Sequence, residues 1–342
     1  MKAAPDVRIG IVAFDTADYL GPCLERLSEA TSGLVVEVVV VDNGSPTTAD
    51  ADVARRFPVE LVRLAENVGY ARGMNVALAD TRAPYLIALN PDTLPGAGSL
   101  RGLVEHLARE PDVGLVGPRL VGTDGSLQHS THAFPSPAVA LTTGFVPPRL
   151  RSGRLGRRMT LEGQVVMDRP SDVDWTVGAV HAVRRSALRR EHAYSERSFM
   201  YAEDMEICWH VRQGGWRVVF DPSVEVVHVG NVSGAKTFGA RRELRWLDAT
   251  YDWYVAEHGA AAARRWAAAN TAGLLNKLAV LSVTRRDPAH RAYVRELADL
   301  HRRRTVHPLG DLHSRDAPDG RPARSLVPVR QGDEATRSPE RT

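Results

Sequence analysis

The sequence has 342 residues, 43% hydrophobic and 25% charged, with a formal net charge of only +3, an ordinary balance for a soluble globular protein. A chain of this length holds one large α/β domain with an appendage, or two domains. The two cysteines, Cys23 and Cys208, fall in helical apolar patterns, which predicts reduced core thiols and disfavours a disulfide framework. The N-terminus lacks the apolar core of a signal peptide, and no run reaches the ~18 apolar residues of a spanning helix. We therefore expect a soluble or peripheral cytoplasmic protein, with the inner face of the plasma membrane as the alternative location.

The first part of the chain alternates predicted strands and helices. Four apolar runs predict buried strands, at residues 7–14, 35–41, 59–64 and 85–89. Two amphipathic patterns predict helices, at residues 16–30 and 73–79. This alternation predicts an α/β fold with right-handed βαβ units and a mostly parallel central sheet flanked by helices. Ligands bind such open sheets beyond the carboxyl ends of the strands, which is where Asp42 and Asp92 lie.

The second part of the chain is more mixed. Further strands are predicted at residues 114–120, 172–183, 216–220 and 224–228. A helix is predicted at 205–213, and the proline- and arginine-rich stretch 134–158 predicts a loop. An alanine-rich helical pattern with paired arginines follows from 240 to 304. We expect a first domain over 1–239, a helical C-terminal extension over 240–313 and a disordered tail over 314–342.

Asp42 ends the second predicted strand in the sequence Asp-Asn-Gly-Ser. Its side chain is placed to accept a hydrogen bond from the imide N–H of a nucleobase, although the same four residues make a good turn without any function. Residues 67–75 form a glycine-punctuated loop that enters a helix, where free N–H groups and Arg72 can hold an anion. The glycines of this loop are four residues apart, so the dinucleotide fingerprint GxGxxG is absent, which disfavours a Rossmann dehydrogenase.

Asn90-Pro91-Asp92 follows the fourth predicted strand. A divalent cation that bridges two phosphates needs hard oxygen ligands, usually one or two carboxylates, and Asp92 supplies one of them. Proline at the second position is equally typical of a turn that ends a strand, so the spacing alone leaves both interpretations open.

Glu203 and Asp204 are adjacent carboxylates at the start of a predicted helix. One of them can take the proton of an attacking hydroxyl, but Asp204 can also be only a helix cap and Glu203 only a surface acid. Glu206 lies about 200° further round the helix, so we expect it on the solvated side. His228 ends the last predicted strand, where its imidazole either completes a metal site or makes a structural hydrogen bond. Trp175, close to Gly178, either lines a sugar pocket or belongs to the core.

Seven segments of the chain, taken together and in order, carry a family resemblance. They are IVAFDTADYLGPCLERL, VVVVDNGS, ENVGYARGMNVAL, LNPDT, VGPRLVGTDGSLQHS, DWTVGAVHAVRRSAL, and MYAEDMEICWHVRQGGWRV with VVHVG. The chain resembles family 2 glycosyltransferases, inverting enzymes with the GT-A fold, and especially their rhamnosyltransferase-like bacterial branch. The resemblance covers about residues 7–233 and continues more loosely to about 300. It implies a donor half over about 1–125 and an acceptor half over about 126–239.

The resemblance also implies roles for single residues. Asp204 would be the catalytic base, supported by Glu203, and Asp92 would hold the metal in a DXD-type motif, with His228 close to it. Trp175 and Gly178 would belong to the sugar or acceptor pocket. The nucleotide site would contain Asp42, Asn67, Gly69, Arg72 and Asn90, and a basic loop with Lys236 and Arg241 would face the diphosphate. The chain departs from the family pattern at Ala13-Phe14-Asp15, where a polar residue, an aromatic and Asn are common, and at Val229, where a second histidine is common.

The resemblance implies transfer of a hexose with inversion, dependent on Mg²⁺ or Mn²⁺. The expected donor is dTDP-rhamnose, and the acceptor is a hydroxyl of a saccharide, lipid-linked saccharide or glycoconjugate in cell-wall or polysaccharide biosynthesis. The alternatives are transfer of galactofuranose, glucose or N-acetylglucosamine from a UDP-linked donor, or a non-catalytic sugar-nucleotide-binding module. The basic C-terminal helices leave peripheral membrane contact open, and a homodimer is open too. Those helices have no interleaved aromatic residues, so nucleic-acid binding is not expected.

Overall fold

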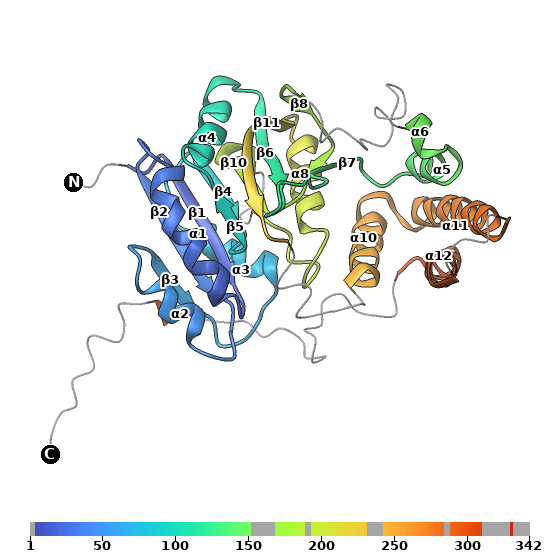
Figure 1. Cartoon of the computed structure of the whole chain (residues 1–342), viewed down its shortest axis with the longest axis horizontal. Helices are drawn as coiled ribbons and strands as arrows, with labels where there is room; N and C mark the ends of the chain where they lie inside the picture. The colour runs from blue at the N-terminus through green and yellow to red at the C-terminus, as the bar shows by residue number, and fades with distance from the viewer. Residues whose placement is uncertain are drawn as a thin grey trace, which may run out of the picture.

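The computed structural model describes residues 4–151, 168–188, 193–230, 242–283, 288–309 and 329–330. It consists of a central sheet with helices on both faces and a group of helices at one end (Figure 1). The strands of the central sheet are β1 (Val7–Ala13), β2 (Val36–Asp42), β3 (Glu60–Arg63), β4 (Tyr85–Leu89), β5 (Thr93–Pro95), β6 (Val113–Val121), β8 (Ser171–Asp172), β10 (Val180–Arg184), β11 (Arg217–His228) and β12 (Val329–Arg330). The helices are α1 (Ala17–Ala30), α2 (Ala49–Ala54), α3 (Tyr70–Leu78), α4 (Ser99–Arg109), α5 (Pro137–Phe145), α6 (Pro148–Arg151), α8 (Glu203–Gln213), α10 (Arg242–His258), α11 (Ala260–Val283) and α12 (Pro288–Arg304).

The sheet has the strand order β12-β3-β2-β1-β4-β10-β6-β11-β5, and β8 pairs with β11. The pairs β3–β2, β2–β1, β1–β4 and β6–β11 are parallel. β10 runs antiparallel between β4 and β6, so these two neighbours point the same way. The long strands therefore share one direction apart from β10, which confirms the mostly parallel sheet predicted from the sequence.

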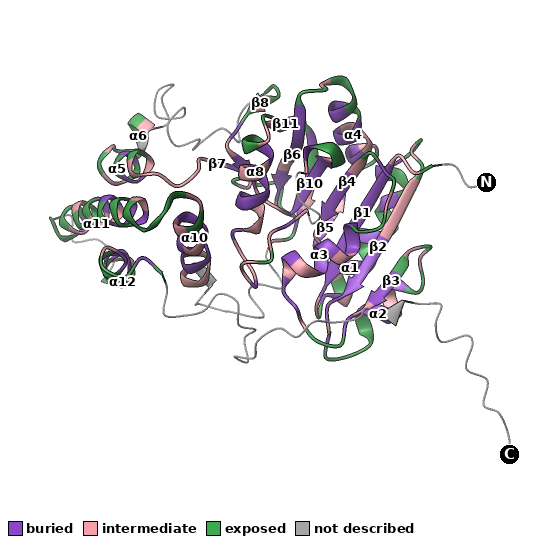
Figure 2. Cartoon of the chain, turned by 180° about the vertical axis from the view of Figure 1, so that it is seen from behind, coloured by how far each residue is buried: buried purple, intermediate pink, exposed green. Residues whose placement is uncertain are grey.

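The central strands of the sheet are largely buried (Figure 2). Their alternate residues belong to two cores, one on each face of the sheet. Ile9 and Ile11 of β1 pack with α1 and α4 on one face. On the other face Val12 belongs to the core formed with α3 and α8. Gly10 lets α3 approach closely, because a Cβ at that position would lie 2.9 Å from the Ala77 Cβ. Cys23 and Cys208 are buried free thiols, as predicted, and burial raises the pKa of each to about 12.

Three local predictions need correction. Residues 172–183 form three short strands, because Trp175–Thr176 (β9) pairs with Thr131–His132 (β7) in a separate two-stranded sheet. The strands predicted at 216–220 and 224–228 correspond to one strand, β11, which begins at Arg217 and continues through a bulge. The predicted loop 134–158 contains α5 and α6, and its residues 152–158 lie outside the described chain. Ser136 caps α5 by accepting from the Val139 N–H, and proline occupies the first turn.

The C-terminal helices pack against the rest of the molecule through aromatic side chains. The rings of Trp209 in α8 and Trp253 in α10 lie 5.5 Å apart, edge to face. The Trp209 Nε1–H donates to the Glu257 carboxylate (3.1 Å), and Arg197 bridges Glu257 (3.4 Å) and Glu206 (3.3 Å). Glu206 is 3% exposed, which corrects the expectation of a solvated position.

The described chain contains no helix that combines the length and apolar character needed to cross a membrane. The predicted tail over 314–342 lies outside the described residues except for β12, which pairs with β3.

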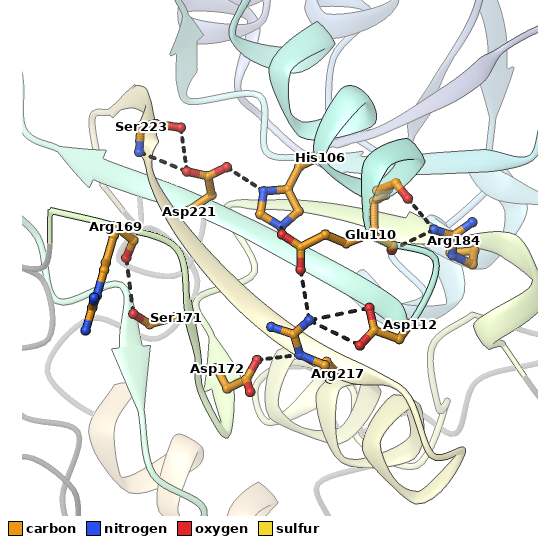
Figure 3. A network of polar contacts seen from close by, with 11 residues as sticks. His106, Glu110, Asp112, Arg169, Ser171, Asp172, Arg184, Arg217, Asp221 and Ser223 are labelled. Atoms are coloured by element: carbon orange, nitrogen blue, oxygen red, sulfur yellow. Dashed lines mark hydrogen bonds and ion pairs between the residues drawn. The ribbon is translucent and has the colours of Figure 1, made fainter.

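A polar network holds the bulge of β11 (Figure 3). Asp221 is opposite Pro118 and Glu225 is opposite Arg119, so extra residues of β11 bulge out between these pairs. Nδ1 of His106 in α4 lies 2.7 Å from Asp221 Oδ2, and the backbone N–H of Ser223 donates to Asp221 Oδ1 (2.9 Å). These contacts fix the strand before it continues to His228.

We expect Asp221→Asn to lower the free energy of unfolding by about 2 kcal/mol at pH 7, because one partner of a buried hydrogen-bonded pair is lost. Burial alone would raise the pKa of Asp221, but hydrogen bonds from His106 and Ser223 outweigh it and hold the pKa below its ordinary value. A lowered folded pKa gives stability that is present above the ordinary carboxyl pKa of about 4 and is lost as the pH falls through the folded value.

Urea unfolding of wild type and Asp221→Asn should therefore differ most near pH 7 and converge on acidification. The control is Asp112→Asn, which removes an exposed ion pair of Arg217 and should cost under about 1 kcal/mol. Equal losses in the two variants would contradict the anchoring role of Asp221.

Candidate active site

Strand pairing brings Asp92 and His228 together. The Asn90 N–H donates to the Ala179 carbonyl oxygen (2.9 Å), which fixes the segment after β4 against the start of β10. β5 then pairs antiparallel with the end of β11, with His228 opposite Thr93, and the Val229 N–H donates to the Asp92 carbonyl oxygen (2.9 Å). As a result, His228 Nε2 lies 3.5 Å from Asp92 Oδ1.

Gln128 orients the His228 imidazole. The Gln128 amide nitrogen donates to the His228 carbonyl oxygen (2.7 Å), so its amide oxygen is left to accept from Nδ1–H (2.9 Å). This arrangement leaves the lone pair on Nε2 directed to the Asp92 side. A ring held through its other nitrogen is typical of metal-binding histidines. Sequence reasoning gave Gln128 no role, although it lies in the segment VGPRLVGTDGSLQHS.

Glu203 and Asp204 begin α8 directly after a strained turn. Tyr201 and Ala202 both have positive φ, at 75° and 67°, which is unfavourable for side-chain-bearing residues. The Asp204 carboxylate accepts from the Gly178 N–H (3.2 Å) and from the Met205 N–H (2.8 Å). A Cβ at position 178 would lie 2.8 Å from the Asp204 Cβ, so this approach requires glycine.

Both groups of residues line one pocket of about 170 Å³. The pocket combines the carboxylates of Asp92, Glu203 and Asp204 with His228, Asn90 and Gly178. Its other lining residues are Val12, Tyr70, Pro91, Val177, Ala179, Met200 and Tyr201. The two acidic positions 92 and 204 therefore converge, as the predicted chemistry requires.

The pocket holds buried polar atoms that lack partners. Within the described chain, Asn90 Oδ1, Glu203 Oε2 and His228 Nε2 make no hydrogen bond. Burial, together with the charge of Asp204, raises the pKa of Glu203 to about 8. Burial also raises the pKa of Asp204, opposed by the N–H groups of Met205 and Gly178. Buried polar atoms without hydrogen bonds destabilise the folded protein until a ligand supplies their partners. The oxygen and imidazole ligands beside Asp92 are of the kind that a divalent cation binds.

The predicted nucleotide-binding residues Asp42, Asn67 and Gly69 do not line this pocket. Asp42 lies at the carboxyl end of β2, where Arg63 Nε donates to Oδ2 (2.7 Å) and the Ser45 N–H to Oδ1 (3.0 Å). Asn67 Oδ1 accepts from the Gly69 N–H (3.0 Å). Gly69 has φ 89°, and a Cβ there would lie 2.2 Å from the Phe199 carbonyl oxygen. Contact of these residues with a nucleotide stays a prediction.

Three further groups of predicted site residues have other contacts or lie outside the described chain, and their ligand roles stay predictions. Arg72, expected to face a phosphate, donates from Nε to Glu196 Oε2 (2.9 Å), so residues 67–75 hold the loop that precedes α8. Trp175 is a core residue whose ring stacks on His132 (4.4 Å) and whose Nε1–H donates to the Ala133 carbonyl oxygen, so it does not line the pocket. Lys236 and Arg241 lie outside the described residues.

Known glycosyltransferases are similar to this chain. A family model described as glycosyl transferase family 2 matches residues 9–164. Over 227 residues, the chain is 34% identical to the N-acetylglucosaminyl-diphospho-decaprenol L-rhamnosyltransferase of Mycobacterium tuberculosis, covering 61% of this chain and 72% of the relative. Over 212 residues, it is 29% identical to the pre-mycofactocin glycosyltransferase of the same organism, covering 60% of this chain and 39% of the relative.

Among solved structures, a mannosyltransferase from Pyrobaculum calidifontis in complex with GDP-Man and Mn²⁺ matches with a TM-score of 0.52 and 18% identity. That match covers 90% of this chain and 85% of the other. The chain therefore belongs to glycosyltransferase family 2, and its fold is of the GT-A type. The family and fold expected from the sequence are confirmed.

We expect Glu203→Gln to stabilise the protein at pH 8 in the absence of ligands. A carboxyl whose folded pKa lies above its unfolded value keeps a proton that the unfolded chain loses. The free energy of unfolding of wild type should therefore fall between about pH 4.5 and pH 8, and the glutamine variant should avoid this loss, by up to a few kcal/mol.

The measurement is urea unfolding with EDTA at pH 5 and pH 8, with Glu25→Gln on the exposed side of α1 as the control. The same stability difference at both pH values would contradict the buried, proton-retaining state of Glu203.

Proposed function

We propose that this protein transfers a hexose from a nucleoside-diphosphate donor to an acceptor hydroxyl in one displacement that inverts the anomeric carbon. The convergence of Asp92 and His228 with Glu203 and Asp204 on one pocket carries this proposal. The pocket thereby combines Asp92, the proposed metal ligand, with Asp204, the proposed base. A metal-assisted sugar transfer needs both groups in one cavity.

We propose that the donor is dTDP-rhamnose and that the transferred sugar is L-rhamnose. The relative at 34% identity carries the name of an L-rhamnosyltransferase that acts on N-acetylglucosaminyl-diphospho-decaprenol. That name also supports a lipid-linked saccharide acceptor and a role in cell-wall or polysaccharide assembly. We propose the cytoplasmic side of the membrane as the place of this reaction. The alternative is another donor on the same fold, with UDP-galactofuranose, UDP-glucose and UDP-N-acetylglucosamine as the candidates.

We assign the cation site to Asp92 and His228. The Mn²⁺ in the mannosyltransferase structure supports a divalent cation. His228 Nε2 makes no hydrogen bond within the described chain and lies 3.5 Å from Asp92 Oδ1, an arrangement that fits a cation. A bound cation would supply Lewis-acid stabilisation to the leaving diphosphate. Either Mg²⁺ or Mn²⁺ suits these ligands.

The proton acceptor in this proposal is Asp204. The acceptor oxygen forms a bond to C1 of the sugar as the bond from C1 to the phosphate oxygen breaks, and the hydroxyl proton passes to the Asp204 carboxylate. The N–H groups of Gly178 and Met205 hold that carboxylate in place. Its raised pKa makes it a stronger base than an exposed aspartate.

The test is release of nucleoside diphosphate from a panel of the four donors, with N-acetylglucosaminyl-diphospho-polyprenol as acceptor. We expect the greatest release from dTDP-rhamnose, loss with EDTA and recovery with Mg²⁺ or Mn²⁺. Asp204→Asn should lower kcat by roughly 10²–10⁴-fold because general-base catalysis is lost. Its Kd for the donor should stay within about twofold, since the group acts on the acceptor.

The matched control is Asp112→Asn, an exposed aspartate beside Arg217, which should turn over like wild type. Wild-type kcat in Asp204→Asn would refute the base assignment. No release from any donor by wild type would favour a non-catalytic binding module.

We also propose peripheral contact with an anionic membrane through the C-terminal helices. A pocket of about 520 Å³ lies at the end of α12 and combines cationic with apolar side chains. Its lining residues are Leu244, Asp248, Leu300, Arg302, Arg303, Arg304, Thr305, Val306 and His307. Arg304 is paired with Asp248. The remaining arginines suit phosphate groups, and the apolar side chains suit a lipid chain. A homodimer stays a prediction.

Arg302→Ala with Arg303→Ala should weaken sedimentation with phosphatidylglycerol vesicles roughly five- to twentyfold. Arg295→Ala, an exposed α12 residue away from the pocket, serves as control. Equal wild-type binding to vesicles of phosphatidylcholine alone, or equal loss in the control, would contradict the contact.

A further inference from the structure

Tyr70 lines the candidate active site, and the chemistry described so far does not use it. Its hydroxyl is buried and makes no hydrogen bond to any residue that the structure describes. The other polar side chains of the pocket include Asp92, Glu203 and Asp204, which accept hydrogen bonds when ionised. A hydrogen-bond donor without a partner in such a pocket points to a ligand.

The chain fixes the Tyr70 ring through contacts outside the pocket. Tyr70 is the first residue of α3, and its N–H donates to the Phe199 carbonyl oxygen (3.1 Å). Its ring meets the Tyr194 ring edge to face, with centroids 6.0 Å apart and an interplanar angle of 87°. Tyr194 is held in turn by Asn75, which donates to the Tyr194 carbonyl oxygen (2.8 Å) and accepts from the Tyr194 N–H (2.8 Å). The hydroxyl is thus presented by a rigid framework.

The Tyr70 hydroxyl stays protonated. Burial raises its pKa well above the ordinary value, and the charges of Glu203, Asp204 and Asp92 add to the shift in that order. The Tyr70 backbone is hydrogen-bonded to Phe199, four residues before Glu203, so Tyr70 is tied to the loop that leads into Glu203 and Asp204. In the proposed function the sugar reacts beside Asp204, while the diphosphate lies with Asp92 and His228.

We propose that the Tyr70 hydroxyl contacts the substrate and donates a hydrogen bond to the sugar moiety of the bound nucleotide sugar. This inference rests on the proposed function and deepens it. The contact favours the nucleotide sugar over the bare nucleoside diphosphate, because only the former carries an oxygen at this position. It also satisfies the hydroxyl that the ligand-free protein leaves without a partner.

The test is Tyr70→Phe, which removes only the hydroxyl. Calorimetry with Mg²⁺ gives the Kd for dTDP-rhamnose and for dTDP, or for whichever donor the panel selects and its nucleoside diphosphate. We expect a roughly five- to tenfold higher Kd for the nucleotide sugar and a Kd within about twofold for the nucleoside diphosphate. The thermal midpoint of the ligand-free variant should equal or exceed that of wild type, since a partnerless buried hydroxyl is lost.

Tyr194→Phe is the matched control, because this buried tyrosine packs against Tyr70 but does not line the pocket. Its hydroxyl lies 3.5 Å from His181 Nδ1, so its loss should lower the thermal midpoint and leave both Kd values unchanged.

Several results would overturn the inference. Unchanged Kd values in Tyr70→Phe, equal weakening of both ligands, or equal weakening in Tyr194→Phe would each do so. If wild type itself binds no nucleotide sugar, the proposed function fails instead, and the thermal midpoints still report whether the Tyr70 hydroxyl is structurally unpaired.

Discussion

The antiparallel pairing of β5 with the end of β11 is the constraint on which the candidate site depends. It places His228 opposite Thr93 and so brings the imidazole beside Asp92. A slip of one residue would turn His228 to the other face of the sheet. The register downstream of Asp221 depends on the bulge of β11, which His106 and Ser223 hold in place. A polar network remote from the pocket thus sets the geometry within it.

Glu203 and Asp204 are held in a strained and desolvated position that lowers the stability of the folded protein. Two residues with positive φ precede α8, and Glu203 retains its proton because it is buried next to Asp204. Such strain and desolvation are typical of sites where reactivity takes precedence over stability. Contacts elsewhere compensate, notably the hydrogen bonds between Asn75 and Tyr194, which anchor the loop before α8.

Local sequence patterns predicted the main strands of the parallel sheet and placed Asp92 at its carboxyl edge. The family resemblance, not the local pattern, implied that Asp92, Glu203, Asp204 and His228 belong to one site. They did not predict partners that are far apart in the chain. Gln128 holds His228 across 100 residues and Arg72 pairs with Glu196 across 124, and neither contact has a local signal. The continuity of β11 was hidden because proline normally ends a strand, whereas here Pro222 falls in the bulge.

The bridge that Arg197 makes between Glu206 and Glu257 bears on how the enzyme can be dissected. One guanidinium joins the loop before the acid pair, the buried side of α8 and the helix α10. Excision of the C-terminal helices would leave Glu206 with a weakened counter-ion arrangement and would uncover the Trp209 indole. The helical extension therefore cannot simply be removed from the rest of the protein. A chimaera that exchanges this extension between relatives must include both Glu257 and Trp253 of α10.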